Sequence, residues 1–391
     1  METTTLFWVF TFIVFYTFVG YGIVLWILVK LKNKFKKTRN SNNEQFELPE
    51  VTLLVAAFNE RDYVASKVGN SFELNYPKDK LKLIWVTDGS NDDTPDLLRQ
   101  YVNIEVLHSP ERKGKINAMH RAMEYVKTPI VVFSDANTML GLDSIMIIAK
   151  LFNDPTIGCV SGEKRIRRKN SDSAAGAGEG LYWRYESFLK KLDFELYSTC
   201  GAAGELFAIR KALYQPVEPD TLLDDFVISL RIVMKGFRIA YNPEAYAEEK
   251  PSASSLDEFG RKTRIAAGGL QSVFRLMPLF NFIKYGIFSF QYVSHRVLRW
   301  TITPYAFFAL LPLNVWIALS SNSFFLILIL QLFFYFLAWI GFQLESRNMR
   351  VKAFFVPYYF VFMNVAVIAG HIKYFRKKQS VNWKKANRAT T

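Results

Sequence analysis

The amino-acid sequence predicts an α/β domain held between membrane-spanning segments. Over residues 41–265, short apolar runs alternate with helical patterns, which is typical of parallel strands covered by helices on both faces. Residues 5–29 carry no charged side chain, and long apolar stretches return after residue 273. Half of the 391 residues are hydrophobic and only two are cysteines, which excludes a mainly disordered chain and a disulfide scaffold.

The first membrane segment is predicted at residues 5–29. Its 25 uncharged residues are enough to cross about 30 Å of hydrocarbon, and it lacks the basic start and short apolar core of a signal peptide. Six basic residues follow it without an intervening acid: Lys30, Lys32, Lys34, Lys36, Lys37 and Arg39. Because basic loops stay on the cytoplasmic side of a membrane, we expect the domain that follows to be cytoplasmic.

The region after residue 270 predicts further membrane segments. Residues 273–293 are apolar but interrupted by polar side chains, so we interpret them as an interfacial helix. Residues 301–319 and 323–343 are predicted to cross the membrane. A crossing at 353–372 would place the seven basic residues of the tail outside, so we favour a re-entrant or interfacial segment there over a crossing at 273–293.

These segments define the expected domains. The chain is divided into an N-terminal transmembrane helix (1–30), a cytoplasmic α/β domain (41–270), an interfacial region (271–298), a C-terminal transmembrane region (299–372) and a basic cytoplasmic tail (373–391). Most of the net charge of +14 lies in residues 30–40, directly after the first membrane segment, and in the tail. This leaves only +2 for residues 41–370. The charge therefore indicates membrane topology, and we expect no nucleic-acid partner.

Polar side chains follow three of the predicted strands. Residues 51–58, 82–88 and 130–136 are apolar runs that end at Asn59–Glu60, Asp88 and Asp135. In open α/β sheets, ligands bind just beyond the carboxyl ends of the strands. These residues are therefore candidates for one site.

Asp88 begins an Asp-Gly-Ser turn, where a carboxylate can accept hydrogen bonds from a nucleobase or ribose; an acidic turn with a capping role is the alternative. Lys115 follows a glycine before a helical run at 116–126, a setting that suits phosphate binding or a solvated basic turn. Asp135 and Asn137 offer two oxygen ligands at i and i+2, which could hold Mg²⁺ or Mn²⁺ against a diphosphate.

Two further motifs lie later in the chain. Asp224 and Asp225 precede a predicted helix, so one could serve as its N-cap and leave the other free as a general base. Adjacent carboxylates raise each other's pKa, which helps a base that must release its proton again. Arg261 and Arg264 form a basic cluster that could clamp a pyrophosphate or contact anionic lipid.

Taken in this order and between these membrane flanks, the motifs resemble the membrane-anchored family 2 glycosyltransferases, such as bacterial poly-N-acetylglucosamine, cellulose and hyaluronan synthases. The resemblance implies a GT-A, Rossmann-like fold and an inverting transfer from a nucleotide-sugar, with UDP-GlcNAc or UDP-Glc favoured, to a growing glycan. It also implies Mg²⁺ or Mn²⁺ as cofactor, an integral protein of a bacterial plasma (inner) membrane in contact with membrane lipid, and room for an accessory subunit.

The resemblance also assigns roles to individual residues. Asp225 corresponds to the general base, and Asp135 with Asn137 to the metal site. Gly204, Glu205 and Asp224 correspond to acceptor-binding positions. The donor-binding positions are Ala57, Asn59, Glu60, Asp88, Lys115, Asp135, Arg261 and Arg264.

The sequence departs from the family pattern at two places. Asn137 replaces the second metal-binding carboxylate, and Arg261 and Ile265 replace the Gln and Trp of the Gln-x-x-Arg-Trp motif of processive members. A single transfer to a lipid or lipid-linked acceptor is therefore one alternative to polymer synthesis. An inactive membrane partner is another, against which the retention of Asp88, Asp135 and Asp225 argues.

Overall fold

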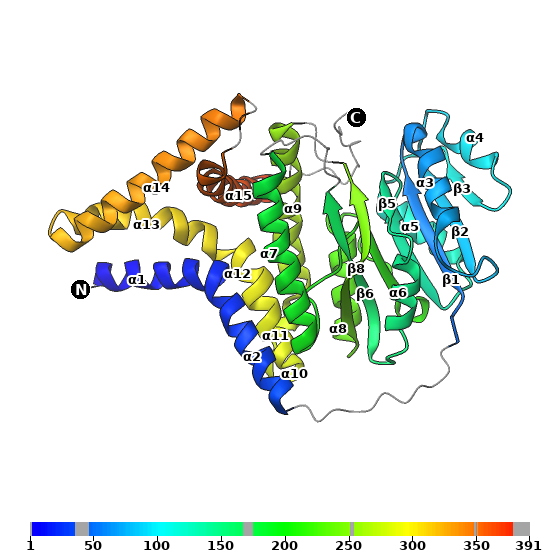
Figure 1. Cartoon of the computed structure of the whole chain (residues 1–391), viewed down its shortest axis with the longest axis horizontal. Helices are drawn as coiled ribbons and strands as arrows, with labels where there is room; N and C mark the ends of the chain where they lie inside the picture. The colour runs from blue at the N-terminus through cyan, green and yellow to red at the C-terminus, as the bar shows by residue number, and fades with distance from the viewer. Residues whose placement is uncertain are drawn as a thin grey trace.

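The computed structural model describes residues 2–35, 47–166, 175–250, 254–347, 349 and 351–377. Lys36, Lys37 and Arg39, together with most of the basic tail (residues 378–391), lie outside the described residues. Figure 1 shows a sheet domain on one side of the molecule and helices that project away from it on the other. Residues 175–180, the second part of the small-residue stretch at 171–180, are helical because α7 begins at Ala175.

An eight-stranded mixed sheet forms the centre of the α/β domain, with the strand order β3-β2-β1-β4-β7-β6-β8-β5. The first four strands are parallel, as the sequence predicts: β1 (Val51–Ala57), β2 (Leu81–Asp88), β3 (Glu105–Ser109) and β4 (Ile130–Asp135). The others are β5 (Thr138–Leu140), β6 (Ile157–Ile166), β7 (Leu206–Arg210) and β8 (Arg238–Glu249). Because β7 runs antiparallel to both β4 and β6, the sheet is mixed rather than wholly parallel.

The two faces of the sheet are covered by different helices. Every residue of β1 is buried, because alternate side chains enter cores on opposite faces. One core is completed by α5 (Lys115–Tyr125) and α8 (Asp224–Met234), and the other by α3 (Arg61–Glu73) and α6 (Ser144–Leu151). The short helix α4 (Thr94–Arg99) lies between β2 and β3 in the chain.

Three described helices are long and apolar enough to cross a membrane: Glu2–Phe35, Asn322–Ser346 and Ala353–Phe375. The first consists of α1 (Glu2–Phe15) and α2 (Tyr21–Phe35), joined by a π-helical turn at Tyr16–Gly20. The second is α14. The third lies in α15 (Lys352–Phe375).

The stretch 273–293 is not the single helix that the sequence suggests. Helix α9 (Ser255–Arg275) ends inside it. Five short helical elements follow: η3 (Met277–Phe280), α10 (Phe282–Tyr285), α11 (Ile287–Tyr292), η4 (Val293–Val297) and α12 (Leu298–Trp300). Pro278 lies in the first break, and Gly286 has a φ of 51°, which favours glycine. A bend of 51° then separates Ile287–Trp300 from α13 (Ile302–Ala318).

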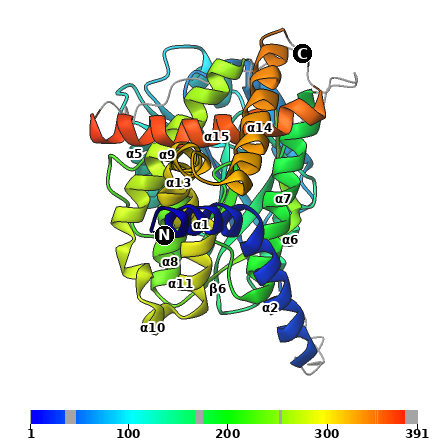
Figure 2. The ribbon, with the colours of Figure 1, turned by 90° about the vertical axis from the view of Figure 1, so that its left-hand side faces the viewer.

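Helix α15 crosses α9 at a small-residue contact. A side chain at Gly370 would come within 2.7 Å of the Thr263 carbonyl and of the Ala266 side chain, so the two helices approach closely only because residue 370 is glycine. Figure 2 shows α15 running across the direction of α1 and α13 rather than alongside them. A segment that lies in the membrane interface, beside two helices that cross the membrane, would have this orientation. The topology predicted for 353–372 remains a prediction.

A buried ionic cluster joins α7 (Ala175–Leu196) to the helices around residues 295–299. Glu186, only 3% exposed, lies 2.8 Å from the Arg296 guanidinium and 2.9 Å from that of Arg299. His295 contacts Glu186 at 3.3 Å and Asp193 at 2.6 Å. The Tyr21 hydroxyl also donates to Asp193, so the cluster anchors the N-terminal helix to the domain.

Replacing Glu186 by alanine should destabilise the protein by about 3–5 kcal/mol, because it removes a buried carboxylate that pairs with the largely buried guanidinium groups of Arg296 and Arg299. Thermal or denaturant unfolding of the detergent-solubilised chain measures the change. Glu195→Ala is the matched control on the same helix, since the Glu195 carboxylate makes an exposed 4.0 Å contact with Lys191 and its loss should change stability by no more than about 0.5 kcal/mol. Equal stabilities of the two variants would contradict the prediction.

Candidate active site

A lysine–aspartate pair lies at the carboxyl end of the parallel strands. Asp135 ends β4, Lys115 begins α5, and the Lys115 Nζ lies 2.7 Å from the Asp135 Oδ1. Burial alone would lower the pKa of Lys115, but the charges of Asp135, Asp224 and Asp225 outweigh it and raise that pKa above its ordinary value. Lys115 is therefore a fixed cation among three acids from two different elements.

Both acids of the Asp224–Asp225 pair lie in the first turn of α8. The expectation that one of them is the N-cap is wrong, because Leu223 occupies that position and the helix begins at Asp224. Free backbone N–H groups and the helix dipole favour negative charge in a first turn. The Asp224 Oδ2 is buried and has no hydrogen-bond partner among the described residues.

Asp225 has the electrostatics of a general base. Burial and the neighbouring charge of Asp224 raise the pKa of Asp225 to about 7, while Lys115 acts in the opposite direction. A carboxylate with a pKa near neutrality can both take and release a proton at physiological pH.

The loop at residues 201–205, which bears the predicted acceptor positions Gly204 and Glu205 and is called the acceptor loop below, packs directly on the start of α8. A side chain at Gly204 would come within 3.2 Å of the Asp225 Oδ2, so glycine leaves the space beside this carboxylate open. Gly201 has a φ of 95°, and a Cβ there would lie 2.3 Å from the Phe226 ring. The Ala202 backbone N–H also donates to the Ser229 hydroxyl at 3.0 Å. The loop is therefore held against α8 with Gly204 facing Asp225.

Glu205 belongs to a buried ion triad. The Lys164 ammonium contacts the carboxylates of both Glu205 and Glu249. Burial alone would raise the pKa of Glu205, but Lys164 holds it well below its usual range. Glu205 therefore stays ionised beside the loop and acts on Asp225 as a further negative charge.

Asp88 organises the turn before Lys115. Its carboxylate, buried at 3% exposure, accepts hydrogen bonds from the Lys113 N–H at 3.1 Å and from the Gly114 N–H at 2.6 Å. The predicted contact of Asp88 with a nucleobase or ribose would therefore compete with these two backbone donors.

Three further candidate residues, Ala57, Asn59 and Glu60, lie at the carboxyl end of β1. Ala57 is buried within β1, and Asn59 adopts a positive φ of 54°. The Asn59 side-chain amide donates to the Asn91 side chain at 2.7 Å, and the Glu60 N–H donates to the Thr94 hydroxyl at 3.0 Å. These bonds fix the loop after β1 against the loop after β2.

Arg261 and Arg264 lie on α9, apart from the Lys115–Asp135 pair. The Arg261 guanidinium makes a bidentate contact with Glu258, with its shortest distance at 2.8 Å, and its charge acts on Glu205. Among the described side chains, none forms an ion pair with Arg264. The charge of Arg261 therefore reaches Glu205 on the acceptor loop, and no ion pair between described residues joins Arg264 to Asp135.

The donor set around Asp135 fits a hard divalent cation. Asp135 and Asn137 present oxygen atoms from the turn between β4 and β5, and no hydrogen bond involves the Asn137 side chain within the described part of the chain. Mg²⁺ and Mn²⁺ prefer oxygen ligands and usually keep several waters, so one carboxylate and one amide are a sufficient protein contribution.

The motifs in the sequence do not point to Lys67, Lys164 or Glu249, which the structure places around the site. A signal for Lys67 exists: it occupies the buried face of α3 together with Val64, Val68 and Ser71, at helical spacing. Lysine is rarely buried unless it is paired, so a lysine in an apolar helical stripe indicates a polar partner inside the fold.

Comparison with known proteins identifies the family. A family model described as "Glycosyltransferase like family 2" matches residues 49–268, more than half of the chain. The probable glycosyltransferase YdaM of Bacillus subtilis is 24% identical over 379 residues, which cover 88% of this chain and 87% of that protein. A poly-β-1,6-N-acetyl-D-glucosamine synthase of Staphylococcus aureus is 26% identical over 282 residues, 68% of this chain and 66% of that protein.

Among solved structures, the mannosyltransferase PcManGT from Pyrobaculum calidifontis, in complex with GDP-Man and Mn²⁺, has a similar fold. Its TM-score is 0.71 at 21% identity, and the match covers 96% of this chain and all of that one. The expected GT-A fold is thereby confirmed. Because the family model covers the whole α/β domain from β1 to α9, the chain belongs to the glycosyltransferase like family 2 and is a glycosyltransferase.

Proposed function

We propose that the chain is an inverting, metal-dependent glycosyltransferase that moves a sugar from a nucleotide-sugar to a growing glycan. The observation that carries this proposal is the position of Asp225, a carboxylate with a pKa of about 7, beside an open glycine position and the Lys115–Asp135 pair. The S. aureus relative is named as a poly-β-1,6-N-acetyl-D-glucosamine synthase, and the solved mannosyltransferase holds GDP-Man and Mn²⁺. These names support a nucleotide-sugar donor and a glycan acceptor, and the family resemblance favours UDP-GlcNAc or UDP-Glc as the donor.

The proposed mechanism is a direct displacement at C1 of the donor sugar. Mg²⁺ or Mn²⁺, when bound at Asp135 and Asn137, supplies positive charge to the diphosphate leaving group. Lys115 adds a permanent cation on the same side of the site. Asp225 takes the proton of the acceptor hydroxyl as its oxygen attacks C1, the bond from C1 to the diphosphate breaks, and the anomeric configuration inverts.

Incubation of the purified protein with a panel of nucleotide-sugars tests the proposal. Mass analysis should show glycan products from UDP-GlcNAc or UDP-Glc, and only with a divalent cation. Absence of transfer and of nucleotide-sugar hydrolysis with every donor and metal would support the inactive-partner alternative instead.

We infer further that the α/β domain and the tail are cytoplasmic, in a bacterial plasma membrane. The two natural cysteines, Cys159 and Cys200, are buried, so a cysteine introduced in the tail would be the accessible one. Thr391→Cys should react with an impermeant maleimide only after the membrane is opened. Labelling of intact cells would contradict the inside location of the tail.

The activity should depend on pH through Asp225. Because the base must be deprotonated, kcat/KM should rise as the pH rises through about 7 and level off above it, in proportion to the ionised fraction of Asp225. Asp224→Asn removes a charge that raises this pKa, so it should move the rising limb to lower pH. A pH–rate profile of each variant measures this, and a limb that stays in place in Asp224→Asn would show that another group controls it.

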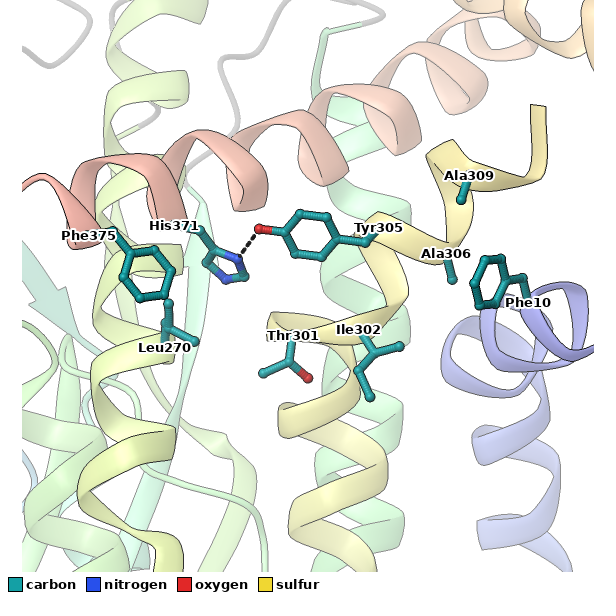
Figure 3. Close-up of a pocket in the computed structure, with 9 residues that line it drawn as sticks. All are labelled: Phe10, Leu270, Thr301, Ile302, Tyr305, Ala306, Ala309, His371 and Phe375. Carbon is teal, nitrogen blue, oxygen red and sulfur yellow. Dashed lines mark hydrogen bonds between the residues drawn. The ribbon is translucent and has the colours of Figure 1, made fainter. Parts of the chain in front are cut away.

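One observation favours the second candidate, transfer of a single sugar to a lipid acceptor. A cavity of about 450 Å³ lies between α1, α9, α13 and α15, and nearly all of its walls are apolar (Figure 3). Its lining residues are Phe10, Leu270, Thr301, Ile302, Tyr305, Ala306, Ala309, His371 and Phe375. The helices that bear them include two candidate membrane spans, so a lipid chain is a suitable occupant.

A chain of contacts leads from this cavity to Phe226, the residue that follows Asp225. The Tyr305 hydroxyl donates to the His371 Nδ1, and the His371 Nε2 donates to the Trp300 carbonyl, each at 2.8 Å. The Trp300 ring then packs on Phe226, the residue after Asp225, at 5.0 Å between centroids. Radiolabelled product that extracts into organic solvent as one sugar per lipid would favour this candidate, and a polydisperse water-soluble product would favour polymer synthesis.

A further inference from the structure

Lys67 is a fully buried lysine beneath the turn that carries Asp135 and Asn137. Its side chain has no solvent exposure. The Lys67 Nζ donates to the Ser134 hydroxyl at 2.7 Å and to the Thr138 carbonyl at 2.6 Å. These two acceptors stand at the two ends of the five-residue segment Ser134–Thr138, so one ammonium group spans the turn from below.

The rest of the turn depends on the same atoms. The Ser134 and Thr138 hydroxyls lie 3.2 Å apart, and the Thr138 hydroxyl donates to the Asp135 carbonyl at 2.9 Å. The Ser134 hydroxyl also lies 3.3 Å from the Glu205 carbonyl, on the acceptor loop. The contact of Lys67 with Ser134 therefore bears on both the turn and the loop beside Asp225.

Packing alone does not account for a lysine at this position. Burial of an ammonium group is costly unless it is paired, and burial does lower the pKa of Lys67 to about 7, against the opposing charge of Asp135. Within the described residues no carboxylate lies within ion-pair distance of Lys67. A methionine of similar length would fill the same space without this cost, so the hydrogen bonds to the turn are what the lysine adds.

We propose that Lys67 is a positioning residue that fixes the spacing between Asp135 and Asn137 and thereby sets the affinity of the chain for a divalent cation. The inference rests on the proposed function only in that these two residues hold the cation. It assigns to Lys67 no contact with donor, acceptor or metal.

Lys67→Met tests the proposal, because it keeps the side-chain length and removes all three N–H donors. Mn²⁺ binding to the purified full-length protein is measured by electron paramagnetic resonance of free Mn²⁺, without sugar transfer. The dissociation constant should rise roughly 10-fold, at the low end of the 10–100-fold typical when groups behind metal ligands are replaced. At saturating Mn²⁺, kcat should recover most of its wild-type value, which a general loss of structure would not allow.

Lys82→Met on β2 is the matched control, since the Lys82 side chain is 51% exposed and contacts Glu50 at 3.0 Å, far from the turn in the sheet register. Its Mn²⁺ affinity should equal that of the wild type. Ser134→Ala removes one of the two acceptors and keeps the lysine, so it should weaken Mn²⁺ binding in the same direction by a smaller factor. It also carries the test if Lys67→Met does not fold.

Unchanged Mn²⁺ affinity in a folded Lys67→Met, or in Ser134→Ala when the first variant is unfolded, would overturn the proposal. A wild-type protein without measurable Mn²⁺ affinity would overturn it as well. A wild-type protein that binds Mn²⁺ but transfers no sugar would instead contradict the proposed function and leave the role of Lys67 standing. The binding measurement therefore separates the two failures.

Discussion

Replacement of Asp225 by asparagine should lower kcat for sugar transfer by about 10²–10⁴-fold, the usual effect of removing a general base. The amide has almost the shape of the carboxylate, so the fit of Gly204 against it should persist. It cannot accept the proton of the acceptor hydroxyl, however, and it lacks the pKa of about 7 that suits Asp225 to this task. Initial rates with saturating nucleotide-sugar and divalent cation measure the effect.

The donor should still bind to this variant, because Asp225 is assigned to the acceptor side of the reaction. Its dissociation constant for the nucleotide, measured calorimetrically, is expected within about threefold of the wild-type value, less than about 1 kcal/mol. Asp96→Asn is a matched control, since the Asp96 side chain is 75% exposed and pairs with Arg99. Full transfer by Asp225→Asn with intact nucleotide binding would show that another group is the base.

The parallel half of the sheet could be predicted because each strand is a short apolar run buried on both faces. Residues 51–58, 82–88 and 130–136 all became strands, with bounds shifted by at most a few residues. The position of the antiparallel strand β7 is harder to predict from the sequence. Its place between β4 and β6 depends on pairing between residues far apart in the chain, which no local pattern encodes.

The candidate site could be predicted only in part, because its electrostatics depend on distances across the fold. The adjacency of Asp224 and Asp225 indicated a raised pKa, and the structure agrees for Asp225. The capping role failed because the helix begins at Asp224, two residues earlier than the apolar pattern suggests. The pairing of Lys115 with Asp135 joins residues on two separate elements, so spacing in the sequence could not reveal it.

The helices after residue 270 were harder still to predict from the sequence. Hydropathy identified the helices α13 and α14, because both are continuous apolar runs. Helix α14 is long and apolar enough to be a span by itself, whereas α13 qualifies only together with Ile287–Trp300, from which it is bent by 51°. Hydropathy could not show that the stretch before them is divided into short pieces. Those breaks come from single residues, Pro278 and Gly286, whose effect on a helix depends on the contacts around them.

Asp135→Ala should lower kcat/KM for sugar transfer by roughly 10²–10³-fold. Metal coordination and its neutralisation of a leaving diphosphate are worth several kcal/mol, and each 1.4 kcal/mol is about tenfold in rate. The substitution removes the carboxylate of the proposed metal site and also the partner of Lys115, which lies 2.7 Å from it. Initial rates over a range of Mn²⁺ concentrations measure the loss.

The two roles of Asp135 can be separated by Asp135→Asn and Lys115→Met. Asp135→Asn keeps an oxygen donor and loses the charge. A high Mn²⁺ concentration should therefore restore part of the activity of Asp135→Asn and none of the activity of Asp135→Ala. Lys115→Met removes the ion pair and leaves the carboxylate free, so its Mn²⁺ affinity should not fall, because Lys115 competes with the cation for the same oxygen. If no Mn²⁺ concentration restored Asp135→Asn, and Lys115→Met lost activity to the same extent, Asp135 would serve to hold Lys115 rather than a metal.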